Sequence, residues 1–178
     1  MKERILDACC LINLFASGEK TSILQACGEF CVSEQVASEA LRIGGIDDED
    51  PSRLVPREID LEAVIRSGLI KACRLEGPAE VEAFVRFAME LGDGEASCLA
   101  IAKSRGWTLA TDDRKARRIA SENGIALTST PELIQEWFQA TGAEEATLIG
   151  LLQNIERFAR FRPRRPDPLH AWWMRHRA

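Results

Sequence analysis

Residues 107–117 read Trp107-Thr108-Leu109-Ala110-Thr111-Asp112-Asp113-Arg114-Lys115-Ala116-Arg117, and this stretch decides the fold. The run Trp107–Ala110 predicts a short apolar strand that ends at a threonine and two aspartates. The residues that follow predict a helix from about 113 to 123, which ends at Gly124. A buried strand that passes directly into a helix is the repeating unit of a parallel sheet.

The same unit is expected several times along the chain. Short strands are predicted within 4–10, 30–32, 69–75 and 125–127. Helices are predicted over 9–28 with a break near Ser17-Gly18, and over 34–41, 59–67, 79–91, 95–105, 131–140 and 144–160. Residues 44–58 are acidic and rich in turn formers, so they predict an exposed loop or an insertion. Strands that alternate with helices predict an α/β fold, a three-layer α/β/α sandwich with a central, mainly parallel sheet.

Length and composition indicate one compact domain. The chain has 178 residues, of which 46% are hydrophobic and 29% charged, as in globular proteins. We expect the folded domain to span residues 1–150, with a helical end and an Arg/Pro/Trp-rich tail over 151–178. The N-terminus lacks the apolar region of a secretory signal, and no apolar run is long enough to cross a membrane. We therefore expect a cytoplasmic protein without a membrane partner.

The net charge of −5 conceals an uneven distribution. Residues 157–178 contain seven arginines and one acid, a charge of +6, whereas the remainder of the chain carries −11. An acidic body does not attract nucleic acid, but a basic tail can contact phosphate. The tail has an equally simple interpretation as a solvated or partner-docking extension. Trp172 and Trp173 in the tail fit docking to either a protein or RNA.

Six cysteines lie within apolar stretches: Cys9, Cys10, Cys27, Cys31, Cys73 and Cys98. Without an export signal, reduced and buried thiols are expected. A zinc site is not expected, because Cys27 and Cys31 have no matching second pair of ligands.

Acidic residues stand at the predicted carboxyl ends of strands, where α/β folds place their ligands. Asp7, Asp112 and Asp113 close predicted strands, whereas Glu39 lies on the helix after the second strand and Glu95 begins the helix after Gly92-Asp93-Gly94. Carboxylates gathered at one place repel one another, and a divalent cation removes that cost. Ligands that are all oxygen select Mg²⁺ or Mn²⁺, which can promote phosphodiester hydrolysis.

Each acid also has a structural interpretation. Asp7 fits an N-cap for a helix beginning at Ala8, and Asp112 or Asp113 fits a cap for the next helix. Glu39 fits a solvated position on the predicted helix 34–41, and Glu95 fits a helix start, where acids complement the dipole. The nearby run Arg114, Lys115, Arg117 and Arg118 fits either a solvated helix face or a phosphate-binding surface.

Four segments resemble the PIN-domain proteins, a group that includes VapC-like ribonucleases. They are Ile5-Leu6-Asp7-Ala8-Cys9 with Asn13, Val32–Glu39, Gly92-Asp93-Gly94-Glu95-Ala96, and Leu109–Arg117. Each segment alone is weakly specific, but the four occur in the family's order at strand-linked positions over residues 4–128.

The resemblance implies a PIN-like sandwich and a Mg²⁺- or Mn²⁺-dependent endoribonuclease. Asp7, Glu39 and Glu95 match the first three acids of the family. Either Asp112 or Asp113 matches the fourth, and Asn13 and Thr111 would support them. The resemblance also implies a homodimer and, for a toxin of a toxin–antitoxin pair, an antitoxin protein partner. The alternative is a catalytically silent PIN-like or receiver-like domain that uses the acidic pocket for binding or regulation.

Overall fold

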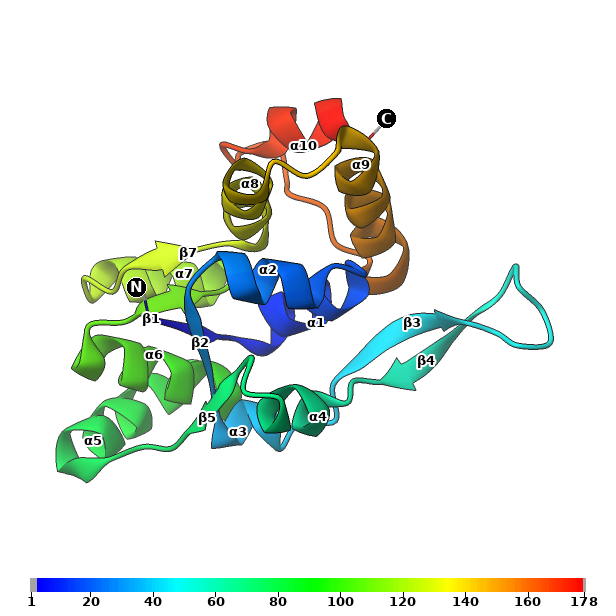
Figure 1. Cartoon of the computed structure of the whole chain (residues 1–178). Coiled ribbons are helices and arrows are strands. Elements are labelled where there is room, and N and C mark those ends of the chain that lie inside the picture. Colours follow the sequence, from blue (N-terminus) through cyan, green and yellow to red (C-terminus); the bar gives the residue numbers. More distant parts are fainter. Residues whose placement is uncertain (1–2, 178) are drawn as a thin grey trace.

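The central sheet is parallel and has five strands (Figure 1). The computed structural model describes residues 3–177. The strands lie in the order β5-β2-β1-β6-β7, where β1 is Glu3–Leu6, β2 Glu29–Ser33, β5 Lys71–Cys73, β6 Thr108–Ala110 and β7 Leu127–Thr128. All four pairings between neighbours are parallel. The carboxyl ends of β1 and β6 therefore meet at one edge, because Leu6 pairs with Ala110.

Helices cover both faces of the sheet, as the three-layer prediction requires (Figure 1). One side carries α1 (Ala8–Ala16), α2 (Lys20–Ala26) and α8 (Thr130–Thr141), and the other carries α5 (Gly77–Ala88) and α6 (Asp93–Arg105). The remaining helices are α3 (Glu34–Ala37), α4 (Leu61–Arg66), α7 (Arg114–Glu122) and α9 (Glu145–Asn154). The three-layer α/β/α prediction is confirmed.

The core is apolar on both sides of the sheet. Ile5 and Leu6 of β1 are fully buried, and so are Leu99 and Ile101 of α6. The predicted alanine-rich helix is almost entirely internal, because Ala96, Ala100 and Ala102 let it lie close against the strands. No helix among residues 3–177 is both long enough and apolar enough to span a bilayer.

The prediction of a loop over 44–58 is wrong. Strands β3 (Arg42–Ile46) and β4 (Leu54–Glu58) form an antiparallel hairpin that projects from the body (Figure 1). Its outer strand ends are polar, and Gly44 and Gly45 interrupt its apolar alternation, so the usual strand signal is missing. A Cβ at Gly45 would stand 2.2 Å from the Arg57 side chain, so the glycine lets that side chain cross over the strand.

The C-terminal segment is folded onto the body. After α9 the chain continues as a π-helical turn, η1 (Ile155–Ala159), and ends in α10 (His170–His176). Trp173 is fully buried, and its ring meets that of Phe161 edge-on at 5.9 Å between centroids. The interpretation of the tail as a solvated extension is therefore wrong for these residues. The predicted boundary at residue 150 falls inside α9 and stays a prediction.

Candidate active site

Asp7 lies between β1 and α1, at the centre of the sheet edge. Its side chain is 3% exposed, and one oxygen accepts a hydrogen bond from the Ala8 N–H at 2.6 Å. The other oxygen accepts from the Thr111 hydroxyl at 2.7 Å and from the Cys9 thiol at 3.2 Å. Asp7 is thus the N-cap of α1 and is also fixed from the neighbouring strand.

Asp113 follows β6 and caps the next helix. One of its oxygens accepts from the backbone N–H groups of Lys115 and Ala116, both at 2.8 Å. Its own N–H donates to the Thr111 hydroxyl oxygen at 3.1 Å. Thr111 is fully buried, and its hydroxyl therefore ties Asp7 to the backbone of Asp113. Thr111 thus lies beside the acids, at the position predicted for a polar supporting residue.

Glu39 and Glu95 come from the other side of the sheet edge. Helix α3 ends at Ala37, so Glu39 lies beyond it and the prediction that Glu39 sits on a helix is wrong. A Cβ added to Gly94 would stand 2.1 Å from a carboxylate oxygen of Glu39. The bare backbone of Gly94 therefore lets the Glu39 side chain lie against the first turn of α6, beside Glu95.

A serine pair holds these two segments together. The hydroxyl of Ser97, on α6, lies 2.7 Å from both the Ser33 hydroxyl and the Gly94 carbonyl oxygen. Ser33 is in turn the N-cap of α3, where it accepts from the Val36 N–H at 3.2 Å. Both serines are fully buried. This link was not predicted, although Ser33 was recognised in the sequence as a helix cap.

The four carboxylates influence one another electrostatically. The pKa of Glu39 is raised by burial and by the charge of Asp7. The pKa of Glu95 is raised by burial and by Asp7, Asp113 and Glu39, against a lowering by its hydrogen bond from the Gly92 N–H. Among residues 3–177, none of the four forms an ion pair with an arginine or lysine. We call Asp7, Glu39, Glu95 and Asp113 the acid group.

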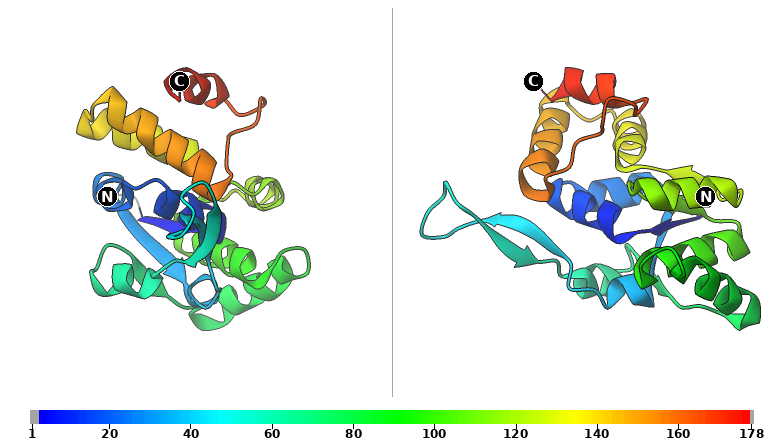
Figure 2. Two further views of the ribbon diagram at one scale, coloured as in Figure 1. Left: turned by 90° about the vertical axis from the view of Figure 1, so that its right-hand side faces the viewer. Right: turned by 180° about the vertical axis from the view of Figure 1, so that it is seen from behind.

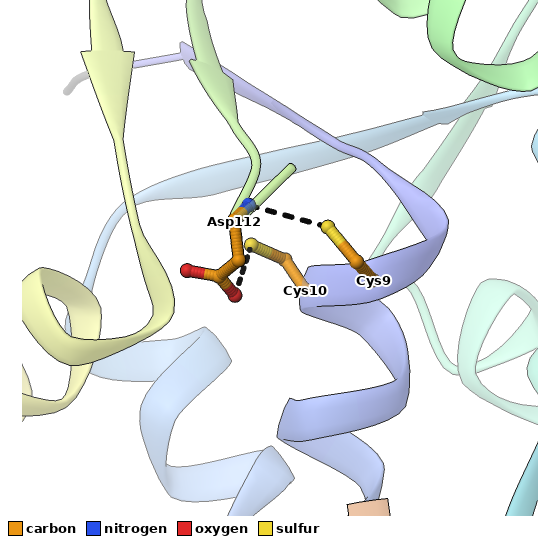
Figure 3. A group of neighbouring side chains, drawn as sticks. All are labelled: Cys9, Cys10 and Asp112. Carbon is orange, nitrogen blue, oxygen red and sulfur yellow. Dashed lines mark hydrogen bonds between the residues drawn. The ribbon is translucent and has the colours of Figure 1, made fainter. Parts of the chain in front are cut away.

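Asp112 points elsewhere. One oxygen accepts from the Thr130 N–H at 3.0 Å, and the other accepts from the Asn13 amide at 3.0 Å and from the Thr130 hydroxyl. The Cys10 thiol donates to that second oxygen at 3.4 Å (Figure 3). Burial raises the pKa of Asp112, whereas these hydrogen bonds lower it. Asn13 therefore supports Asp112, as predicted for a polar neighbour of the acids, and does not contact Asp7.

Cys9, Cys10 and Asp112 have donor atoms that all lie within 4.8 Å of one another (Figure 3). In the described part of the chain this is the one such set of three, so the acid group is wider than a closed coordination sphere. Asp112 already accepts four hydrogen bonds, and burial raises the pKa of the Cys10 thiol well above its usual value. These contacts fit a packed polar core better than a metal site.

The acid group has the donor chemistry of a site for a hard divalent cation, although among the described residues no three of its carboxylates lie as close together as Cys9, Cys10 and Asp112 do. Its donors are carboxylate oxygens only, and no arginine or lysine among residues 3–177 forms an ion pair with them. Oxygen ligands of this kind suit Mg²⁺ or Mn²⁺. A bound cation would offset the mutual repulsion that raises the pKa of Glu39 and Glu95.

A family model described as a PIN domain (DUF3368) matches residues 3–147. The chain belongs to the PIN-domain family. PIN domains are generally nucleases, and they typically bind divalent metals. No curated protein matches the chain at a significant level.

The family resolves one alternative of the sequence analysis. A receiver-like domain would have the strand order 2-1-3-4-5. This PIN domain instead places β5 and β6 on opposite sides of the β2-β1 pair, with the hairpin outside the sheet. The receiver-like interpretation is therefore wrong, and a nuclease-type fold with an acidic sheet edge is what the chain presents.

Proposed function

We propose that this PIN domain is a Mg²⁺- or Mn²⁺-dependent endoribonuclease that hydrolyses RNA phosphodiester bonds at the acid group. The observation that carries the proposal is the placement of Asp7, Glu39, Glu95 and Asp113 at one sheet edge, where they act on one another electrostatically and none forms an ion pair within residues 3–177. Nucleases of this kind need oxygen ligands for a cation and room for a phosphodiester. Family membership supports the nuclease class.

The residues of the acid group would share the cation. When bound, the cation supplies a Lewis acid for the phosphoryl oxygen and acidifies water near neutral pH. Asp7 is the most firmly held ligand, because its two oxygens accept three hydrogen bonds. Asp113 is held by the first turn of α7, and Glu39 and Glu95 close the opposite side.

Asp112 has a positioning role in this proposal. Its contacts with Asn13 and Thr130 tie the end of β6 to α1 and α8. That link fixes the direction in which the next residue, Asp113, leaves the strand. We therefore assign the fourth acid of the site to Asp113 and the support beneath it to Asp112.

The test is RNA cleavage by the purified protein, with Asp7→Asn as the comparison. Wild type should cleave RNA with Mg²⁺ or Mn²⁺ and should lose activity in EDTA. Asp7→Asn should be inactive. Asparagine keeps the cap on α1, and circular dichroism of the variant checks that it is folded. Full activity in the variant would refute the site, and no metal-dependent cleavage by wild type would favour a catalytically silent PIN domain.

Partners form the second part of the proposal. We propose that the protein acts in the cytoplasm as a homodimer, and that an antitoxin protein covers the acid group when the nuclease is a toxin. Light scattering coupled to size-exclusion chromatography measures the molar mass in solution, which tests whether the protein is a dimer. Growth arrest on expression, relieved by a co-expressed neighbouring reading frame, measures the toxin role.

A further inference from the structure

A cleft of about 530 Å³ lies beside the acid group. Its floor includes Cys9, Asp112 and Asp113, and one wall carries Arg114 and Arg117 of α7. The other wall is the C-terminal segment 160–167. Both α7 and the connection from η1 to α10 lie on the side that faces the viewer in the right-hand panel of Figure 2. The volume is within the range of about 300–1,000 Å³ that is typical of ligand pockets.

Five arginines line this cleft: Arg114, Arg117, Arg160, Arg162 and Arg164. Arg162 is neutralised by Glu156, with contacts of 2.5 and 2.9 Å, and Arg117 donates to the carbonyl oxygens of Thr111 and Thr128. Arg114, Arg160 and Arg164 are exposed and form no ion pair within residues 3–177. The cleft therefore holds free positive charge within reach of the acidic sheet edge.

The wall formed by the C-terminal segment is held in place. Glu156 accepts from the Trp173 indole N–H at 2.9 Å and pairs with Arg177 at 3.1 Å. The carbonyl oxygen of buried Pro163 lies 2.8 Å from Nδ1 of His170. Arg160 and Arg164 thus project from a folded segment whose position is set on both sides.

The backbone at Arg160 is a second observation. Its φ of 55° is the one positive value among the non-glycine residues that the structure describes. This left-handed conformation costs about 1–2 kcal/mol for a residue with a side chain and favours glycine. Arg160 is the C-cap of η1, so this conformation marks the point where the chain leaves the helical turn and begins the wall of the cleft.

We propose that this cleft binds the phosphate backbone of single-stranded RNA beside the scissile bond, with Arg160 and Arg164 facing Arg114. The inference rests on the proposed ribonuclease function for the identity of its ligand. An acidic body of charge −11 repels RNA, so the substrate needs a local source of positive charge. The segment that carries +6 supplies it, because Arg160 and Arg164 line the same cleft as Asp113.

Binding can be measured without cleavage. A fluorescent single-stranded RNA is titrated in EDTA, and its anisotropy gives Kd for wild type and two double variants. Arg160→Ala/Arg164→Ala removes two charges from the cleft. Arg165→Ala/Arg175→Ala removes two exposed arginines of the same segment that do not line it. We expect the cleft variant to raise Kd about 10- to 50-fold and to lower the magnitude of the salt slope by about 1.4, and we expect the control to change Kd less than about threefold.

The other outcomes separate the cleft proposal from the ribonuclease function on which it rests. An equal loss of RNA affinity in the two variants would show general electrostatic attraction rather than binding in the cleft. If wild type does not bind RNA, then RNA is not the ligand of the cleft. Faster cleavage by the cleft variant would show that the segment obstructs the site. Wild type that binds RNA through the cleft but never cleaves it would refute the ribonuclease function while retaining the cleft. If wild type cleaves RNA and both variants bind RNA equally well, the cleft proposal would be refuted and the ribonuclease function retained.

Discussion

Asp112 and Asp113 are neighbours in the chain, but they face opposite environments. The Asp112 carboxylate is surrounded by donors from Asn13, Thr130 and Cys10. The Asp113 carboxylate caps α7 and shares an electrostatic field with Glu95. Both oxygens of Asp112 accept hydrogen bonds from within the protein, whereas within residues 3–177 one oxygen of Asp113 accepts none and can bind a cation. The role of an aspartate at a strand end therefore follows from its hydrogen-bond partners and not from its position in the sequence.

The largest effect is expected from Asp113→Asn. The asparagine still caps α7, so the free energy of unfolding should change by less than about 0.5 kcal/mol. The lost charge should reduce RNA cleavage by at least about 100-fold. Cleavage rates and urea denaturation of the same preparation measure the two effects. Near-normal activity would move the fourth acid back to Asp112.

The opposite pattern is expected from Asp112→Asn. An amide NH₂ would face the Asn13 amide and the Thr130 hydroxyl, which both donate to that oxygen now. Leaving such donors unpaired should cost about 2–3 kcal/mol of stability. Cleavage per folded molecule should fall less than in Asp113→Asn. A variant as stable as wild type would contradict the assignment of Asp112 to the fold.

Gly94→Ala should sharpen the comparison on the other side of the acid group. The new methyl group would overlap a carboxylate oxygen of Glu39, so that side chain must move away from Glu95. We expect half-maximal cleavage to require about tenfold more Mn²⁺. Helix α6 should be retained, because alanine favours helix. Titration of activity with Mn²⁺ measures this. Gly92→Ala, where the nearest atom to the new Cβ is 3.9 Å away, is the matched control.

The smallest effect is expected at Glu80, a buried carboxylate that the chain itself neutralises. Arg105 donates to its two oxygens at 2.8 and 2.9 Å, and this pairing lowers the pKa of Glu80. The stabilisation is therefore present above the unfolded pKa of about 4.3 and is lost as the pH falls below it. Glu80→Gln should cost about 1–2 kcal/mol at pH 7, converge with wild type in acid, and leave cleavage unchanged. A pH series of thermal unfolding measures it.

The sequence predicted the parts of this molecule that follow local rules. The strands ending at Asp7 and Asp113 were visible because apolar runs pass directly into capped helices. The hairpin was not, because Gly44, Gly45 and Pro56 weaken the alternation that marks strands. The early end of α3 before Glu39 also escaped, since nothing in the residues 38–41 forces a helix to stop.

The orientation of Asp112 depended on residues that are distant in the sequence. Its partners Asn13 and Thr130 lie on α1 and α8, and no spacing rule connects them. The folding of the basic tail likewise depended on Glu156, which accepts from Trp173 and pairs with two arginines. Both features are tertiary, so a pattern read along one strand or helix does not contain them.

Asp7 and Asp113 are each the N-cap of a helix, and this affects how such a protein can lose its activity during evolution. One base change turns an aspartate codon into an asparagine codon, and asparagine serves a helix start equally well. A gene copy could therefore lose its chemistry while its product still matures, escapes proteolysis and meets its partners. Such a copy would persist as a decoy that folding-based selection cannot detect, so activity in relatives must be read from these two positions rather than from an intact fold.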